Sequence, residues 1–147
     1  MAETLGSLCD KLTILLLKQW HSQDQEQFKN IALQKKMLQE EIDEYTRSAV
    51  SGLIPFERLS LPANKVYQKA SNRIDEFHGD LGETISQLAL INCQLWHQQE
   101  MVYEFEAVPI TEKDTVIKQL AILNLERTHC IDQINCGFAL LIKNSLA

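Results

Sequence analysis

The most informative segment of the chain reads Leu5-Gly6-Ser7-Leu8-Cys9-Asp10-Lys11-Leu12-Thr13-Ile14-Leu15-Leu16-Leu17-Lys18-Gln19-Trp20-His21. Its leucines recur three or four positions apart, and Ile14 and Leu17 widen the apolar stripe that they form. This spacing is typical of one face of an amphipathic α-helix. It predicts a first helix from about Thr4 to His21, with an apolar face that must be buried against other helices.

A second helical stripe follows directly and extends to about Arg47. Ser22 with Gln25 three residues later fits a capping box at its start. No Gly or Pro intervenes, however, so one helix running through Ser22 is the alternative. The segment from Ser51 to Pro62 then reads as a connection, and its apolar residues indicate a packed loop.

Three more helices are expected after the connection. Pro62 suits the first turn of a third helix, whose inward residues would be Val66, Ala70, Ile74 and Phe77. Asp80 and Glu83 fit a cap pair for a fourth helix, which Val108-Pro109 ends. Thr111 opens a fifth helix that extends to about Asn144.

The composition supports the same fold. The 147 residues include 5 Gly and 3 Pro, few for a sandwich or barrel that needs many turns. We therefore predict a single all-α domain over residues 1–147, built as an antiparallel bundle of four to five helices.

Charge and cysteine usage limit the function classes. A net charge of −6 argues against nucleic acid and anionic membranes as partners. The first residues lack the basic region of a signal peptide, and apolar runs such as Ile14 to Leu17 are too short to span a bilayer. None of the four cysteines, Cys9, Cys93, Cys130 and Cys136, lies in a C-x-x-C pair. We interpret them as reduced, buried thiols in a cytoplasmic protein, with a metal or disulfide role as the alternative.

An internal repeat offers a metal-site hypothesis. A shift of 76 residues matches Leu5-Gly6, Leu12 and Trp20-His21 to Leu81-Gly82, Leu88 and Trp96-His97. An acid stands three residues after each of three histidines, on the same helix face, in the pairs His21 with Asp24, His97 with Glu100, and His129 with Asp132. Imidazole and carboxylate together suit Zn, Fe or Mn. The alternative is that these are polar groups at the helix surface or core edge, with Trp20 and Trp96 as core-edge residues.

An acidic pattern offers a second hypothesis. Glu40, Glu41 and Glu44 form E-E-x-x-E, and Glu76 and Asp80 follow. This resembles the all-helical nucleoside triphosphate pyrophosphohydrolases, in which such acids hold Mg²⁺ against phosphates. The second element here is E-x-x-x-D, where that family has E-x-x-D, and solvent-facing acids are the alternative. No G-x-S-x-G, P-loop, H-E-x-x-H or dinucleotide motif occurs in the chain.

The stretch from Gly6 to Lys18 resembles the opening of a group of uncharacterised bacterial helical proteins, G-x-[LI]-x-D-K-L-[ST]-I-L-x-[IL]-K. Their later motifs correspond here to Asn92, Leu95-Trp96, Glu100, Asn124, Glu126-Arg127 and Ile134-Asn135. Such proteins are often encoded beside sugar-transferase genes. The resemblance implies a cytosolic helical fold linked to surface-polysaccharide synthesis, and it assigns no catalytic residue.

The function we expect is a non-catalytic helical binding or scaffolding protein. Long apolar stripes on the first and last helices would leave a face for a partner helix, and a homo-oligomer is the simplest partner. The Mg²⁺-dependent pyrophosphohydrolase and the metal-binding bundle stay as alternatives.

Overall fold

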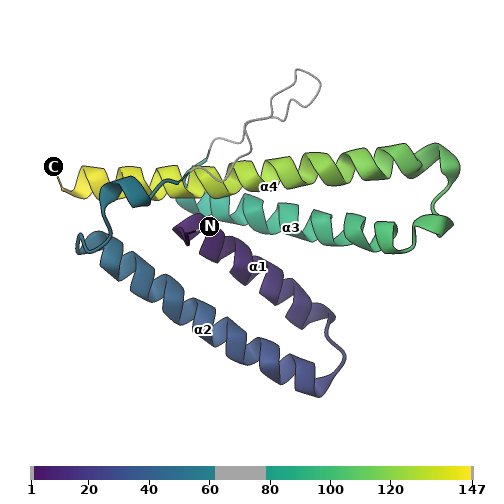
Figure 1. The fold of residues 1–147 in the computed structure, drawn as a ribbon, viewed down its shortest axis with the longest axis horizontal. Coiled ribbons are helices and arrows are strands. Elements are labelled where there is room, and N and C mark those ends of the chain that lie inside the picture. Colours follow the sequence, from purple (N-terminus) through teal and green to yellow (C-terminus); the bar gives the residue numbers. More distant parts are fainter. Residues whose placement is uncertain (1, 62–78, 147) are drawn as a thin grey trace.

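The computed structural model describes residues 2–61 and 79–146, and this part of the chain is mostly helical (Figure 1). Its four α-helices are α1 (Leu5–His21), α2 (Gln25–Val50), α3 (Leu81–Tyr103) and α4 (Ile110–Ser145). Two single-turn 3₁₀ helices, η1 (Phe56–Arg58) and η3 (Phe105–Ala107), lie in the connections. The predicted all-α class is confirmed, with no β-strand among the described residues.

Two hairpins build the bundle. α1 pairs with α2 and α3 pairs with α4, and the first hairpin crosses the second at an angle (Figure 1). Among these helices, α1 is the central one, because it packs against the other three, whereas α2 makes its main contacts with α1. The α1 helix is therefore the element that joins the two hairpins.

The core lies mainly between α3 and α4. Its buried apolar side chains include Leu88 and Ile91 on α3 with Leu123, Ile134 and Phe138 on α4. Burying each such side chain contributes about 1.5–3 kcal/mol. α1 and the far end of α2 extend this core through residues such as Leu5 and Ala49. The stripes predicted from helical spacing therefore account for the packing.

The N-termini of α1 and α2 test the capping residues predicted from the sequence. Thr4 caps α1 through a capping box with Ser7. A break at residues 22–24 separates α1 from α2, so the alternative prediction of one continuous helix through Ser22 is wrong. The predicted capping box of Ser22 and Gln25 is wrong as well, because the Asp24 side chain accepts the Glu26 N–H at 3.1 Å and is the cap.

The second hairpin follows the predicted boundaries. α3 begins after Asp80, which holds the N-cap position without a side-chain capping bond, so Asp80 and Glu83 are not a reciprocal cap pair. α4 runs one residue beyond each predicted end. The predicted third helix, with Val66, Ala70, Ile74 and Phe77, lies outside the described residues.

Several burial predictions need correction. Cys9 and Cys130 are buried, but Cys93 and Cys136 are exposed, because they lie beside the apolar stripes and not on them. Trp20 is 85 % exposed and so is not a core-edge residue, since no neighbouring helix covers it. Across the described helices, none is long and apolar enough to cross a membrane.

Candidate functional site

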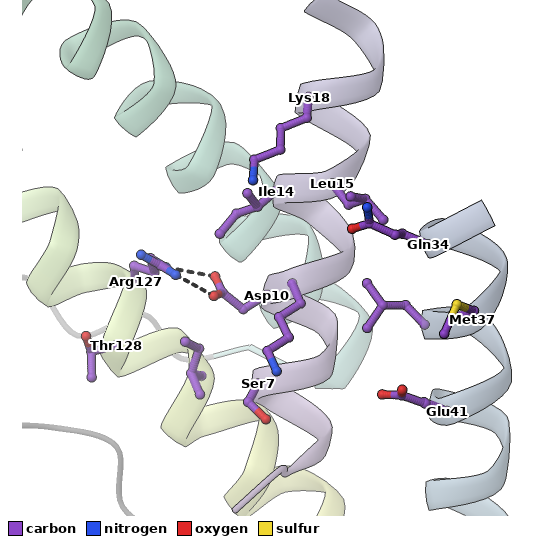
Figure 2. Close-up of a pocket in the computed structure, with 13 residues that line it drawn as sticks. Ser7, Asp10, Ile14, Leu15, Lys18, Gln34, Met37, Glu41, Arg127 and Thr128 are labelled. Atoms are coloured by element: carbon purple, nitrogen blue, oxygen red, sulfur yellow. Dashed lines mark hydrogen bonds and ion pairs between the residues drawn. The ribbon is translucent and has the colours of Figure 1, made fainter. Parts of the chain in front are cut away.

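A buried polar network joins α1 to α3 and α4. The Arg127 guanidinium donates from Nε to Asp10 Oδ1 at 2.8 Å and from Nη2 to Asp10 Oδ2 at 2.6 Å (Figure 2). Asn92 Nδ2 donates to the same Asp10 Oδ1 at 3.0 Å and to Thr13 Oγ1 at 2.7 Å. Three helices are thus tied together around one carboxylate.

This network compensates a charge that burial alone would disfavour. The Asp10 side chain is 7 % exposed, and an unpaired carboxylate there would cost several kcal/mol. The hydrogen bonds to Asp10 and its negative charge raise the pKa of Arg127 despite partial burial. The Arg127 guanidinium therefore stays protonated at any pH at which the protein is folded.

A second polar contact lies one turn away, at the start of α1. The Gly6 main-chain N–H donates to Asn135 Oδ1 at 2.7 Å. A Cβ at Gly6 would overlap the main-chain oxygen of Ile131 on α4. Glycine is therefore required here for the close approach of α1 to α4.

No sequence pattern predicted that these residues form a site. Asp10, Asn92, Arg127 and Asn135 all fall in the segments that carry the bacterial resemblance. The signal that would have found them is a polar residue inside an apolar stripe, as Asp10 is after Leu8-Cys9. Such a residue needs a buried partner, but its spacing cannot name that partner.

A groove crosses α1 on the side of Arg127. It encloses about 650 Å³ between α1, α2 and α4, as Figure 2 shows. Its floor is one row of α1 side chains, Ser7, Lys11, Ile14 and Lys18. Leu15 joins this floor, and the walls are Gln34, Met37, Leu38 and Glu41 of α2 and Arg127, Thr128 and Ile131 of α4.

Of the two lysines that line the groove, Lys11 has an ion-pair partner and Lys18 has none among the described residues. Lys11 is bound to Glu3, which lies outside the groove. Although partial burial favours the protonated form, the hydrogen bonds from Lys11 and Ser7 and the Lys11 charge hold the pKa of Glu3 below its usual value. In the described part of the chain, Lys18 has no ion pair or hydrogen bond of its own. The groove therefore has an apolar body with one uncompensated cation at its edge.

The structure does not gather the predicted metal ligands. The His21 ring stacks on Trp96 with centroids 4.6 Å apart, and its Nδ1 lies 2.8 Å from the Leu17 carbonyl oxygen. Asp24 caps α2, and Glu100 accepts the Trp96 indole N–H at 2.8 Å. His97 is exposed, while His129 and Asp132 are half-buried on α4. Over residues 2–61 and 79–146, no three His, Cys, Asp or Glu side chains form a group able to hold a metal ion.

The acids of the pyrophosphohydrolase hypothesis also stay apart. Glu40, Glu41 and Glu44 are exposed along α2, and only Glu41 lines the groove. Asp80 lies at the start of α3, and Glu76 lies outside the described residues. Within the described segments, Glu40, Glu41, Glu44 and Asp80 belong to no group of three such side chains that could hold a metal ion.

Exposed apolar side chains gather at one end of the molecule. There the end of α2, the connection with η1 and the end of α4 lie together (Figure 1). We define this end surface by its exposed members, Val50, Leu53, Phe56, Leu61, Leu140, Leu141 and Leu146. Leu53 and Leu146 are exposed by 79 % and 76 %, so the surface is open to solvent.

Comparisons of the chain with protein-family models, with curated proteins and with solved structures found no match. The groove, the polar network and the end surface therefore have to be interpreted from their own chemistry.

Proposed function

We propose that this protein is a non-catalytic helical scaffold of the cytoplasm that self-associates through its end surface. The exposed apolar side chains of that surface are the observation that carries the proposal. Large apolar side chains exposed on neighbouring segments are typical of a protein interaction site. The polar network supports a structural role, since its hydrogen bonds join α1 to α3 and α4.

A second copy of this chain fits the end surface in charge as well as in polarity. Glu57, Arg58 and Lys143 are exposed and belong to the same segments as the apolar residues. Because both signs are present, a two-fold contact can set a carboxylate of one copy against a cation of the other. A self-complementary surface is what an isologous dimer requires.

The test is the mass of the protein in solution. We expect light scattering coupled to gel filtration to give a dimer or larger oligomer, and Leu53→Glu with Leu141→Glu to give a monomer. Ile110→Glu is the matched control, because Ile110 is 87 % exposed at the opposite end, beside the α3–α4 connection. A wild-type protein that stays monomeric at high micromolar concentration would contradict the proposal.

The proposed setting is surface-polysaccharide synthesis, and it rests on the bacterial resemblance of residues 6–18. A scaffold in that setting would retain sugar-transferase machinery when purified under gentle conditions. Affinity purification of the tagged protein from bacterial lysate, followed by mass spectrometry, checks this. Recovery of the protein without any sugar-transferase component would remove the setting and leave the self-association intact.

A further inference from the structure

We propose that the groove between α1, α2 and α4 binds an amphipathic anion, an apolar chain that ends in a carboxylate or a phosphate monoester. This goes beyond the proposed scaffold, which uses the end surface and not the groove. The inference rests on the shape of the groove, its apolar lining and the position of its cations.

The apolar part of the ligand would lie along α1. Ile14 and Leu15 line the floor, while Met37, Leu38 and Ile131 face it from the two walls. From Ser7 to Lys18 the floor is about 16 Å long at 1.5 Å per residue. A cavity of about 650 Å³ with this length suits an extended alkyl chain.

The head group would lie at the Lys18 end. In Figure 2 the Lys18 side chain bends back toward Ile14, on the side of α1 that Arg127 faces. Arg127 uses two of its five N–H donors on Asp10, so the others remain for an anion. Lys18 has no partner among residues 2–61 and 79–146, and an anion would supply one.

Glu41 gives the ligand a direction. It lines the other end of the groove, at the level of Ser7 in Figure 2, and would repel a carboxylate or phosphate there. A neutral chain would lose the contact with Lys18, and a cationic chain would be repelled by it. The chemistry therefore selects an anion, with its charge beside Lys18 and its chain directed toward Met37.

Titration with short soluble amphiphiles tests the assignment. We expect decanoate and decyl phosphate, below their micelle concentrations, to bind in a 1:1 ratio and to shift the ¹³C-methyl resonance of Met37. Met101 on α3, outside the groove, is the internal reference and should not move. Decanol should bind about fivefold more weakly and decyltrimethylammonium more weakly still. Equal affinity for all four compounds, or equal shifts of both methionines, would overturn the proposal.

Paired variants separate the head group from the chain. Lys18→Gln should weaken decanoate binding about fivefold, whereas Lys36→Gln, the same charge change on α2 outside the groove, should leave it unchanged. Met37→Glu should weaken binding more than tenfold, while Leu33→Glu, one turn away and 60 % exposed, serves as its control. If Lys18→Gln binds as wild type, the head-group position is wrong.

Membrane lipids present the same chemistry in another form, so vesicles form the last arm. The groove is long enough for a ten-carbon chain, and binding should therefore be seen with monomeric decanoate. Cosedimentation with phosphatidylglycerol vesicles, without any binding of decanoate or decyl phosphate, would show a membrane surface effect and overturn the groove site. All of these outcomes are independent of the oligomeric state that tests the proposed scaffold.

Discussion

Asp10 is the side chain on which the junction of three helices depends. Its carboxylate is buried, and Arg127 supplies two of its hydrogen bonds. Removing one partner of a buried ion pair leaves an uncompensated charge, which destabilises the fold more than replacing both partners with apolar residues would.

We expect Arg127→Ala to lower the free energy of unfolding by about 3 kcal/mol, measured by urea denaturation. Lys118→Ala, which removes an exposed cation of α4 outside the network and the end surface, is the control and should change it by less than about 0.5 kcal/mol. A loss at Arg127 no larger than that at Lys118 would show that solvent reaches Asp10 and that the network does little for stability.

The four thiols should separate into two reactivity classes. Burial, with the charge of Asp10 beside Cys9 and of Glu126 beside Cys130, raises the pKa of each of these thiols to about 11. Both stay protonated and unreactive at pH 8 and at pH 9, because the thiolate is the nucleophile.

Titration with Ellman's reagent at pH 8 should therefore show two fast thiols, Cys93 and Cys136, and two slow ones. Adding denaturant should release the slow pair. Four thiols that react at one rate in the folded protein would contradict this assignment.

At the scale of the helix, positions that match in the internal repeat do not have the same surroundings. Gly6 and Gly82 match under the 76-residue shift, yet Gly6 is pressed against α4 and Gly82 has open space around it. We expect Gly6→Ala to destabilise the fold by about 2 kcal/mol through a forced shift of α1. Gly82→Ala should have a small stabilising effect of about 0.5 kcal/mol because alanine is the better helix former. Thermal unfolding of the two variants checks the pair, and similar midpoints would mean that α1 moves away from α4 without cost.

The α2 helix should be the least stable of the four. Its main contacts are with α1, and its large side chains Leu33 and Met37 are exposed by 60 % and 52 %. Few buried contacts allow local opening at a free energy below that of global unfolding. Hydrogen exchange read by mass spectrometry should show α2 amides between residues 30 and 44 exchanging before the central amides of α3 and α4. Equal protection of α2 and α4 would show that the bundle opens only as one unit.

The helices themselves were largely predictable, because helical spacing is a local property. Leu5 to Leu15 predicted α1, and Val108-Pro109 separated α3 from α4 correctly. The exact caps were less predictable, since Ser22 and Asp24 offer equivalent oxygens and only the path of the chain selects Asp24. The surroundings of Trp20 and Trp96 could not be predicted either, because they depend on which helix faces each.

At the scale of the whole molecule, the site was not predictable from spacing. Asp10 and Arg127 are 117 residues apart, and Gly6 and Asn135 are 129 apart. No periodicity within one helix states which turn of another helix it meets. The groove likewise depends on how α2 is placed beside α1 and α4. The histidine pairs illustrate the same limit, because a shared helix face brings only two groups together.

Self-association through the end surface should link stability to concentration. A protein that buries apolar surface only as an oligomer is stabilised by mass action. Raising the protein concentration a hundredfold should therefore raise the unfolding midpoint by roughly 3 °C. The Leu53→Glu, Leu141→Glu variant should unfold at one temperature throughout the range. A wild-type midpoint that is independent of concentration would contradict the proposed self-association.

The separation of Asp10 from Arg127 along the sequence also has a consequence for folding during translation. At about 5–20 residues per second, the ribosome adds Arg127 roughly ten seconds after Asp10. Until then the first hairpin has no guanidinium for its carboxylate and no α3 or α4 on which to settle. Until α3 and α4 have been synthesised, the leucines of the nascent α1 that will face them therefore stay exposed to water or are bound by a chaperone.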